Sequence, residues 1–248
     1  MEKVAIISDI HGNIPALEAV LKDIKDRSCD KIICLGDIVG KGPNSSEALD
    51  ICKEECDVIV LGNWDKYVAN NDVAGNIGWY REEIGKERLE YLKGLPEAVG
   101  FYLSGRYVRL FHAHPHDVFS RLWPNSPREE KLKMFEVPKI ISLDNEICES
   151  DIVGYGDIHG AFMEPLFGGK LLFNVGSIGN PCDHITMASY AILEGDLESR
   201  EISNFSVQFQ RVIYDIEEAV QLAKNSSLPT IETYIKELTT AIYSGNRE

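Results

Sequence analysis

Residues 4–13 read VAIISDIHGN, an apolar run that ends in an aspartate and a histidine two positions apart. A continuous apolar run of this kind is typical of a strand that is buried on both faces. Apolar residues then recur at helical spacing over residues 17–24, which predicts a helix, and Pro15 suits the first turn of that helix. The stretch therefore predicts that Asp9 and His11 lie where a buried strand gives way to a helix.

The same arrangement recurs twice further along the chain. Residues 32–37 read IICLGD and, after another predicted helix, residues 58–63 read VIVLGN. Alternating strands and helices indicate parallel sheet units, in which ligands bind beyond the carboxyl ends of the strands. We therefore expect Asp9, Asp37 and Asn63 to lie together at one edge of a sheet.

The second half of the chain is richer in predicted strands. One predicted strand leads directly into His112, and another ends at the sequence Gly-Asp-Ile-His that contains Asp157 and His159. The expected strands of this half are 99–103, 107–111, 152–155, 171–175, 189–193 and 207–212. The expected helices after the first three strands are 64–95, 128–136, 215–224 and 229–242.

The length and composition indicate a soluble globular protein with a substantial core. We expect a single domain over residues 1–248, with an insertion at about 113–150 that walls the active site. The net charge of −15 argues against general nucleic-acid binding, but a bound cation would still allow a phosphorylated ligand. No leader or membrane-spanning run is apparent and no C-x-x-C pair occurs, so we expect a cytoplasmic protein with reduced cysteines.

Seven polar residues at the predicted strand ends form a candidate metal site. They are Asp9, His11, Asp37, Asn63, His112, Asp157 and His159. Carboxylate, imidazole and amide ligands together suit divalent ions such as Mn, Fe, Co or Zn better than soft thiolate metals. Two such ions about 3.5–4 Å apart would share a bridging carboxylate and would activate a water for attack at phosphorus.

The ordered motifs resemble those of the calcineurin-like metallophosphoesterases, whose pattern is D-x-H, G-D-x-x, G-N-H-D/E, H and G-H-x-H. The resemblance is to the small prokaryotic phosphodiesterase branch, and it extends from residue 4 to the closing helices. It implies a four-layer α-β-β-α sandwich of two mixed sheets. It also implies two divalent metal ions, with Mn or Fe favoured and with Zn, Co or Ni as further candidates.

The resemblance also assigns the ligands. The first metal would be held by Asp9, His11 and His159, and Asp37 would bridge the two metals. The second metal would be held by Asn63, His112 and the residue at position 157.

Two positions depart from the family pattern. Asp157 stands where the family has a histidine, so it either ligates through a harder oxygen, which favours Mn or Fe, or leaves the second metal weakly bound. Trp64 stands where the family has a histidine that is often assigned to protonating the leaving group, and an indole is no general acid. We therefore expect substrates with good leaving groups. Asp65, the family's partner to that histidine, is left to capping or to hydrogen bonding with a loop.

Two further residues are candidates for supporting roles. His114, two positions after a predicted ligand, is a candidate catalytic group, and the alternative is a loop histidine bonded to backbone. Asn13 is a candidate for binding substrate or a metal ligand at the start of the first helix, and it is equally suited to cap that helix. These two roles of Asn13 are compatible.

The function implied by the resemblance is two-metal hydrolysis of phosphodiester or phosphoanhydride bonds in small molecules by a metal-bridging water or hydroxide. Nucleotide phosphodiesters and dinucleoside polyphosphates are the candidate substrates, and no membrane partner is expected. One alternative is a serine/threonine-type protein phosphatase of the same fold. Another is a catalytically weak metal-binding scaffold, for which Trp64 and Asp157 are the motivation.

Overall fold

Two five-stranded sheets form the centre of the molecule. The structure is a computed structural model that describes residues 1–70, 75–143 and 146–245. The first sheet has the order β10 (Ser206–Val212), β9 (Ala188–Gly195), β1 (Glu2–Ile7), β2 (Lys31–Cys34) and β3 (Val58–Ile59). The second has the order β4 (Ala98–Leu103), β5 (Arg106–Phe111), β6 (Ile152–Tyr155), β8 (Leu171–Asn174) and β7 (Phe162–Pro165).

Both sheets contain parallel and antiparallel strand pairs, in agreement with the expected two mixed sheets. β1 pairs in parallel with β2, and β2 with β3, so the three predicted parallel strands at the start of the chain are confirmed. β9 and β10 add antiparallel strands to the other side of β1. In the second sheet β5, β6 and β8 are parallel neighbours, while β4 and β7 are antiparallel edge strands.

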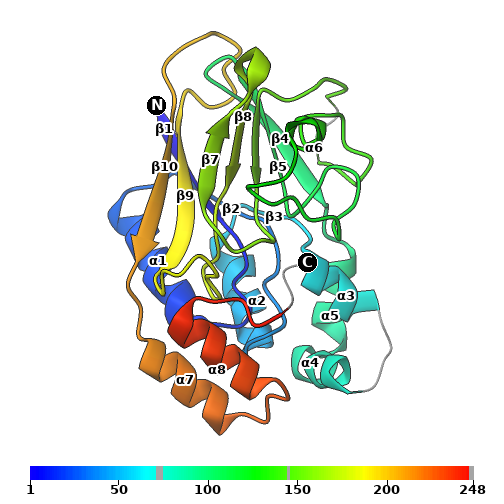
Figure 1. The fold of residues 1–248 in the computed structure, drawn as a ribbon, viewed down its shortest axis with the longest axis vertical. Coiled ribbons are helices and arrows are strands. Elements are labelled where there is room, and N and C mark those ends of the chain that lie inside the picture. Colours follow the sequence, from blue (N-terminus) through cyan, green and yellow to red (C-terminus); the bar gives the residue numbers. More distant parts are fainter. Residues whose placement is uncertain (71–74, 144–145, 246–248) are drawn as a thin grey trace.

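Helices cover the outer face of the first sheet and gather below the ends of its strands (Figure 1). They are α1 (Ile14–Asp26), α2 (Ser45–Glu55), α3 (Asn63–Asn70), α4 (Asn76–Ile84), α5 (Lys86–Lys93), α7 (Ile216–Asn225) and α8 (Ile231–Thr240). No helix in the described ranges is long and apolar enough to cross a bilayer. The cytoplasmic location stays a prediction.

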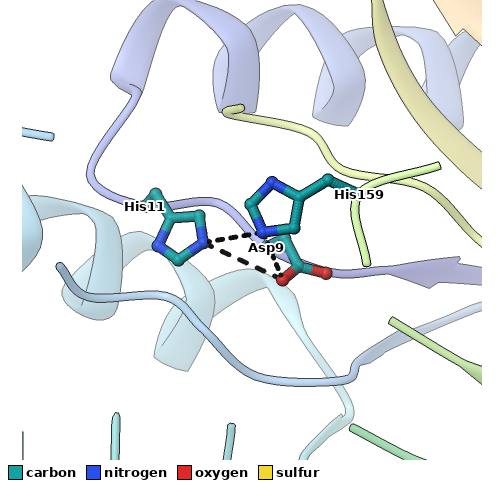
Figure 2. A group of neighbouring side chains, drawn as sticks. All are labelled: Asp9, His11 and His159. Atoms are coloured by element: carbon teal, nitrogen blue, oxygen red, sulfur yellow. Dashed lines mark hydrogen bonds and ion pairs between the residues drawn. The ribbon is translucent and has the colours of Figure 1, made fainter. Parts of the chain in front are cut away.

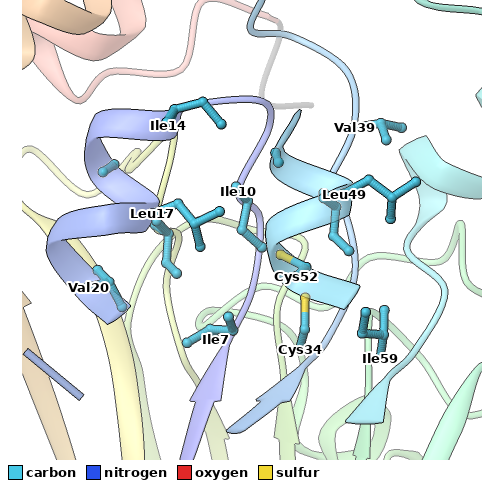
Figure 3. Close-up of a cluster of buried hydrophobic side chains, with 14 of the residues drawn as sticks. Ile7, Ile10, Ile14, Leu17, Val20, Cys34, Val39, Leu49, Cys52 and Ile59 are labelled. Atoms are coloured by element: carbon cyan, nitrogen blue, oxygen red, sulfur yellow. The ribbon is translucent and has the colours of Figure 1, made fainter. Parts of the chain in front are cut away.

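The core follows the alternation of side chains along β1. Val4 and Ile6 point into the layer between the two sheets, whereas Ala5 and Ile7 point toward the helices. Figure 3 shows the helix-facing cluster, in which side chains from α1 and α2 pack over the ends of β1, β2 and β3. Because both faces of β1 are covered, its continuous apolar run is fully buried.

The outer face of the second sheet is covered by the segment that joins β5 to β6. This segment contains one short helix, α6 (Arg128–Lys133), and is otherwise irregular. Its apolar side chains pack on Phe111, Val153 and Tyr155 of the sheet, and they include Leu122, Met134 and Phe135. The fourth layer is therefore mostly loop, and the expected four-layer sandwich of two mixed sheets is confirmed.

The structure divides one predicted helix and contains one strand that was not predicted. The expected helix 64–95 is divided into α3, α4 and α5, with residues 71–74 outside the described ranges. Gly75 and Gly85 precede α4 and α5 with φ angles of 83° and 77°, a conformation that interrupts a helix. The edge strand β7 was not predicted, because only half of its side chains are partly buried and its period is weak.

Candidate metal centre

The seven predicted ligands all lie where the strands of both sheets end. Asp9 and His11 follow β1, Asp37 follows β2, Asn63 begins α3, His112 follows β5, and Asp157 and His159 follow β6. All seven are buried, and the most exposed of them retains 7% of its accessible surface. The sequence therefore identified one cluster that joins the two sheets, built from loops of four strands and the first residue of one helix.

Five of these residues turn the chain sharply, because their φ angles are positive. The angles are 56° for Asp9, 49° for His11, 51° for Asp37, 64° for Asp157 and 57° for His159. Such left-handed conformations cost non-glycine residues about 1–3 kcal/mol each and persist where the surroundings hold them. The turns return the ligand side chains to the strand ends, and their strain is typical of functional sites.

One group of three ligands converges on a single point (Figure 2). His159 Nε2 lies 3.1 Å from Asp9 Oδ1, and His11 Nε2 lies 3.8 Å from the same oxygen. The two Nε2 atoms are 3.3 Å apart. Ligand atoms about 2.0–2.1 Å from one tetrahedral ion would be roughly 3–3.5 Å from one another, so this group has the spacing of a metal site.

The other ring nitrogen of each histidine faces a backbone carbonyl. Nδ1 of His11 is 3.1 Å from Val39 O, Nδ1 of His112 is 2.9 Å from Leu35 O, and Nδ1 of His159 is 2.5 Å from Asn180 O. A carbonyl accepts only, so each Nδ1 carries the proton and donates it. Nε2 is then the nitrogen directed into the site in all three rings, which is the arrangement that metal-binding histidines show.

Asp37 lies between the first group and a second one. Its Oδ2 is 3.6 Å from His11 Nε2, while its Oδ1 is 3.5 Å from His112 Nε2. Asp9, Asp37 and His112 form the second convergent group, so Asp9 belongs to both. A carboxylate that faces a ligand of each group has the position that a bridging ligand needs.

The charges of the cluster shift the titration of its histidines. Burial acts against protonation of His112, yet the Asp37 carboxylate raises the pKa of this ring to about 10. Burial likewise opposes protonation of His159, while Asp9 raises its pKa to about 10. Burial lowers the pKa of His11 to about 3. Two of the three rings therefore hold a proton that a cation would displace.

Asp157 lies beside the second group but is already bound by protein groups. Its Oδ1 accepts hydrogen bonds from Asn63 Nδ2 at 2.6 Å and from Arg121 Nε at 3.1 Å, and it lies 3.9 Å from His112 Nε2. Burial raises the pKa of this carboxyl. Arg121 was not identified from the sequence, because nothing in its segment has a recognisable motif or period.

Asp65 braces the loop that carries Asp37. Its Oδ2 accepts from the N–H groups of Asp37 (2.8 Å) and Gly62 (3.0 Å), and its Oδ1 accepts from those of Ile38 and Val39 (both 3.1 Å). Burial and the Asp37 charge raise the pKa of Asp65 to about 7, whereas these donors favour the ionised form. The expected hydrogen bonding of Asp65 with a loop is confirmed.

Two glycines let the Asp37 and Asn63 loops touch. A Cβ on Gly36 would lie 2.2 Å from Gly62 N, and a Cβ on Gly62 would lie 2.2 Å from Asp37 N. Real side chains never approach so closely, so both positions require glycine. The close approach explains how ligands from neighbouring strands reach one site.

Trp64 forms a wall of the site. Its backbone N–H donates to Asp37 Oδ1 at 2.7 Å, and its ring meets the His11 ring edge-on with centroids 6.2 Å apart. The indole also packs directly over Gly40, where a Cβ would lie 2.3 Å from the ring. The position that a histidine has in the family pattern is thus filled by a large apolar surface beside the metal ligands.

The two supporting candidates face groups of their own loops. Asn13 accepts from Ala16 N at 3.2 Å, which caps α1, and donates to Gly179 O at 2.9 Å. The helix-capping role of Asn13 is confirmed, and substrate binding stays a prediction. His114 Nδ1 accepts from His116 N at 3.2 Å, so the ring is turned toward its own loop. Its catalytic role also stays a prediction.

A small cavity of about 60 Å³ opens beside the ligands, enough for a few waters or one polar group. It is lined by Asp37, Lys41, Trp64, Arg121, Trp123, Asp157, Ile158, His159, Cys182 and Tyr243. Lys41, Arg121 and Tyr243 were not identified from the sequence. They come from three distant segments, and only the folded chain brings them together.

The donor set fits divalent cations. Three buried polar atoms of the cluster make no hydrogen bond: Asp9 Oδ1, His112 Nε2 and Asp157 Oδ2. Buried polar atoms without partners are rare in proteins, and an ion would satisfy these three. Oxygen and imidazole donors together favour borderline-hard ions such as Mn²⁺, Fe²⁺ or Zn²⁺.

Comparisons with known proteins show the family of the chain. A family model described as "Calcineurin-like phosphoesterase superfamily domain" matches residues 2–198. An uncharacterized protein of Methanocaldococcus jannaschii is 31% identical over 250 residues, covering 91% of this chain and 93% of that protein. A symmetrical bis(5′-nucleosyl)-tetraphosphatase of Psychromonas ingrahamii is 31% identical over 113 residues, 44% of this chain and 39% of that protein.

The likeness extends to solved structures. The crystal structure of a metallophosphoesterase from Sphaerobacter thermophilus superimposes with a TM-score of 0.75 at 24% identity. The match covers 97% of this chain and 99% of that one. At this level of identity the likeness concerns the fold alone.

Proposed function

Because the chain belongs to the calcineurin-like phosphoesterase superfamily, we propose that it hydrolyses phosphodiester or phosphoanhydride bonds of small molecules with two divalent metal ions. Mn²⁺ and Fe²⁺ are the first candidates, and Zn²⁺, Co²⁺ and Ni²⁺ also suit the donors. One observation carries the proposal: two convergent ligand groups share Asp9, and Asp37 faces both.

In this proposal Asp9, His11 and His159 hold the first ion and Asp37 bridges the pair. Asn63, His112 and Asp157 hold the second ion. When bound, two neighbouring ions supply a nucleophilic water of lowered pKa and stabilise charge on the attacking and leaving oxygens. The three Nδ1 donors direct the histidine Nε2 atoms into the site, and His112 and His159 would give up a proton from Nε2 when an ion binds.

The surrounding side chains would orient the phosphate. Lys41 and Arg121 line the cavity from opposite segments and offer cationic donors to phosphate oxygens. Trp64 excludes water from one wall but supplies no proton to a leaving group. The proposal therefore favours phosphoanhydrides and activated diesters, whose leaving groups depart without a general acid.

The relative from Psychromonas ingrahamii supports a nucleotide substrate, since its name refers to the hydrolysis of dinucleoside tetraphosphates. Dinucleoside polyphosphates and nucleotide phosphodiesters are accordingly the proposed substrate class. We also propose that residues 1–248 act as one domain and that residues 113–150 wall the site. Residues 71–74, 144–145 and 246–248 lie outside the described ranges. Arg121 and Trp123, which line the cavity, support the second of these points.

The first experiment strips the protein of metal and resupplies Mn²⁺, Mg²⁺, Zn²⁺ or Fe²⁺. Hydrolysis of bis(p-nitrophenyl) phosphate, p-nitrophenyl phosphate and diadenosine tetraphosphate is then measured. We expect turnover to return with Mn²⁺, with the diester and the anhydride preferred over the monoester. Asp37→Ala should abolish turnover, and the exposed Asp50→Ala should leave it unchanged. A preference for alkyl monoesters would contradict the argument from Trp64.

A second candidate function follows from the ion pair between Arg121 and Asp157, which competes with the second ion. The chain would then be a metal-binding scaffold with weak activity. In that case metal analysis of the resupplied protein should find fewer than two ions per chain, and no metal should restore turnover with any activated ester.

A further inference from the structure

A second cavity adjoins the metal centre. Its volume is about 240 Å³, and three of its lining residues, Lys41, Trp64 and Tyr243, also line the smaller cavity beside the ligands. The remaining wall comes from α8 and the residues on either side of it, namely Thr230, Thr233, Tyr234, Glu237, Ser244 and Gly245. A ligand bound at the metal ligands would therefore extend past Trp64 into this space.

The second cavity is walled by aromatic rings. Trp64 and Tyr243 are half-buried and line both cavities, while Tyr234 is buried at the base. The segment that carries Tyr243 is held on both sides: His184 N donates to Ala241 O at 3.0 Å, and Ser244 N donates to Glu237 Oε1 at 2.8 Å. The Tyr243 ring thus has a fixed backbone opposite the indole.

Lys41 lines both cavities and so lies at their junction. Lys41 Nζ donates to Asn180 Oδ1 at 2.8 Å, lies 3.8 Å from Glu237 Oε2 and is 5.5 Å from the centroid of the Tyr243 ring. An ammonium group at this point faces the middle part of a ligand that has one end in the second cavity and the other end at the metal ligands. A phosphate or phosphate chain has the charge that suits it.

We propose that the second cavity binds the aromatic base of a nucleoside phosphate, with the base against Trp64 and Tyr243 and its phosphates passing Lys41. This inference rests on the proposed phosphoesterase function. Every base offers a flat π-face to aromatic side chains, and the cavity falls below the roughly 300–1,000 Å³ of pockets for whole drug-sized ligands. It has room for part of a ligand, such as one ring system.

The proposal also gives Trp64 a role at the position where the family pattern has a histidine. A large ring next to the ligands closes the metal site on one side and offers a stacking surface on the other. Trp64, which stands in place of the proton-donating histidine, would then contribute to substrate binding instead. Selectivity would come from recognition of the nucleoside, which is remote from the bond that breaks.

Binding of two small probes tests the base-binding cavity without relying on turnover. Isothermal titration of the full-length, Mn²⁺-loaded protein would compare AMP with ribose 5-phosphate, which lacks the base. We expect AMP to bind about tenfold more tightly, the scale of one base stacked on an aromatic side chain. Equal affinities, or no binding of either probe, would overturn the proposal.

Two matched variants locate the effect on α8. Thr233 is exposed and lines the cavity, so Thr233→Trp should fill the space and remove the preference for AMP. Thr239 is exposed on the same helix outside the cavity lining, and Thr239→Trp should keep the preference. Tyr243→Ala should lower the affinity for AMP several-fold, whereas Tyr243→Phe, which keeps the ring, should leave this affinity unchanged. A Thr233→Trp protein that still prefers AMP would contradict the assignment.

The failure of this inference and that of the proposed function give different results. Metal-dependent hydrolysis of bis(p-nitrophenyl) phosphate, measured on the same preparations, reports on the phosphoesterase function. Turnover of this diester together with equal binding of the two probes would reject the base-binding cavity alone. Preferential AMP binding without turnover by any metal would reject the phosphoesterase function and keep the cavity.

Discussion

The two ligand groups of the metal centre are built alike but differ in what their side chains already bind. In the first group, His11 and His159 direct their Nε2 atoms at Asp9 Oδ1, and no hydrogen bond from a cationic side chain to this oxygen is recorded among the described residues. Beside the second group, Asp157, the further ligand proposed for the second ion, accepts hydrogen bonds from Asn63 and Arg121. The difference shows that a shared carboxylate does not make the two sites equivalent.

This contrast leads to unequal affinities. An ion in the first group gains two imidazoles and a carboxylate that are already directed at it. An ion that uses Asp157 must instead compete with the Arg121 guanidinium, which lies 3.1 Å from the carboxylate. We therefore expect the first ion to bind more tightly than the second, and the predictions below test this order.

The largest effect should come from removing a ligand of the first group. His159→Ala deletes one of three convergent donors, and we expect the affinity of the tighter site to fall by more than about 100-fold. Loss of an outer partner alone costs 10–100-fold, and a direct ligand costs more. Mn²⁺ titration of the metal-stripped protein measures the change, with the exposed His184→Ala as control. Two ions bound with unchanged affinities would contradict the assignment of the first group.

Protons should compete with metal in both groups. His159 in the first group and His112 in the second each have a pKa of about 10, so at neutral pH each must lose a proton before it ligates. Affinity should rise with pH, by about tenfold per unit for each displaced proton, until about pH 10. His11, with a pKa of about 3, should contribute nothing above about pH 4.

The number of protons is measured by calorimetry in buffers of different ionisation enthalpy. At pH 7.5 we expect each of the two binding steps to release one proton. Release in one step alone would show that the groups differ in protonation as well as in their contact with Arg121.

Asp157→His should change which metal the second group prefers. The variant restores the imidazole of the family pattern and removes the negative partner of Arg121. We expect the affinity ratio of Zn²⁺ to Mn²⁺ at the weaker site to rise by on the order of tenfold, because nitrogen suits Zn²⁺ better than a carboxylate oxygen does. The first site should be unaffected. Competition titrations with the two metals provide the test, and an unchanged ratio would mean that residue 157 is no ligand.

The smallest effect should come from Arg121→Gln. Loss of the cation removes a competitor for Asp157, so the second ion should bind about fivefold more tightly, the scale of a partly exposed ion pair of about 1 kcal/mol. The exposed Arg200→Gln serves as control. A weaker second ion in Arg121→Gln would indicate that the guanidinium positions Asp157 for binding and does not compete with metal.

The sequence predicted that the candidate ligands converge, because most of them lie close after a buried strand. The period of the apolar runs locates the strand ends, and parallel strands bring Asp9, Asp37 and Asn63 to one edge. The pairing of the two sheets came from the family resemblance, since local periodicity carries no information on which faces pack together. It is this pairing that adds His112 and His159 to the same cluster.

Local sequence patterns could not identify the remaining residues of the site. Arg121 lies in an irregular segment and Tyr243 follows the last helix, so neither has a period or motif. Lys41 sits in a loop, with a positive φ angle of 56° that no sequence rule assigns to lysine. Such residues acquire a role only through contacts between segments more than 70 residues apart in the chain.

The place of His159 in the chain has a consequence for biosynthesis. Neither proposed ligand set is complete in sequence when residue 112 has been made, because the second ion also needs Asp157 and the first needs His159. At about 5–20 residues per second, translation needs roughly 2–9 s more to reach residue 159. A ribosome-bound chain therefore carries five of the seven predicted ligands before either set can be completed, and both sets are then completed within two residues of each other.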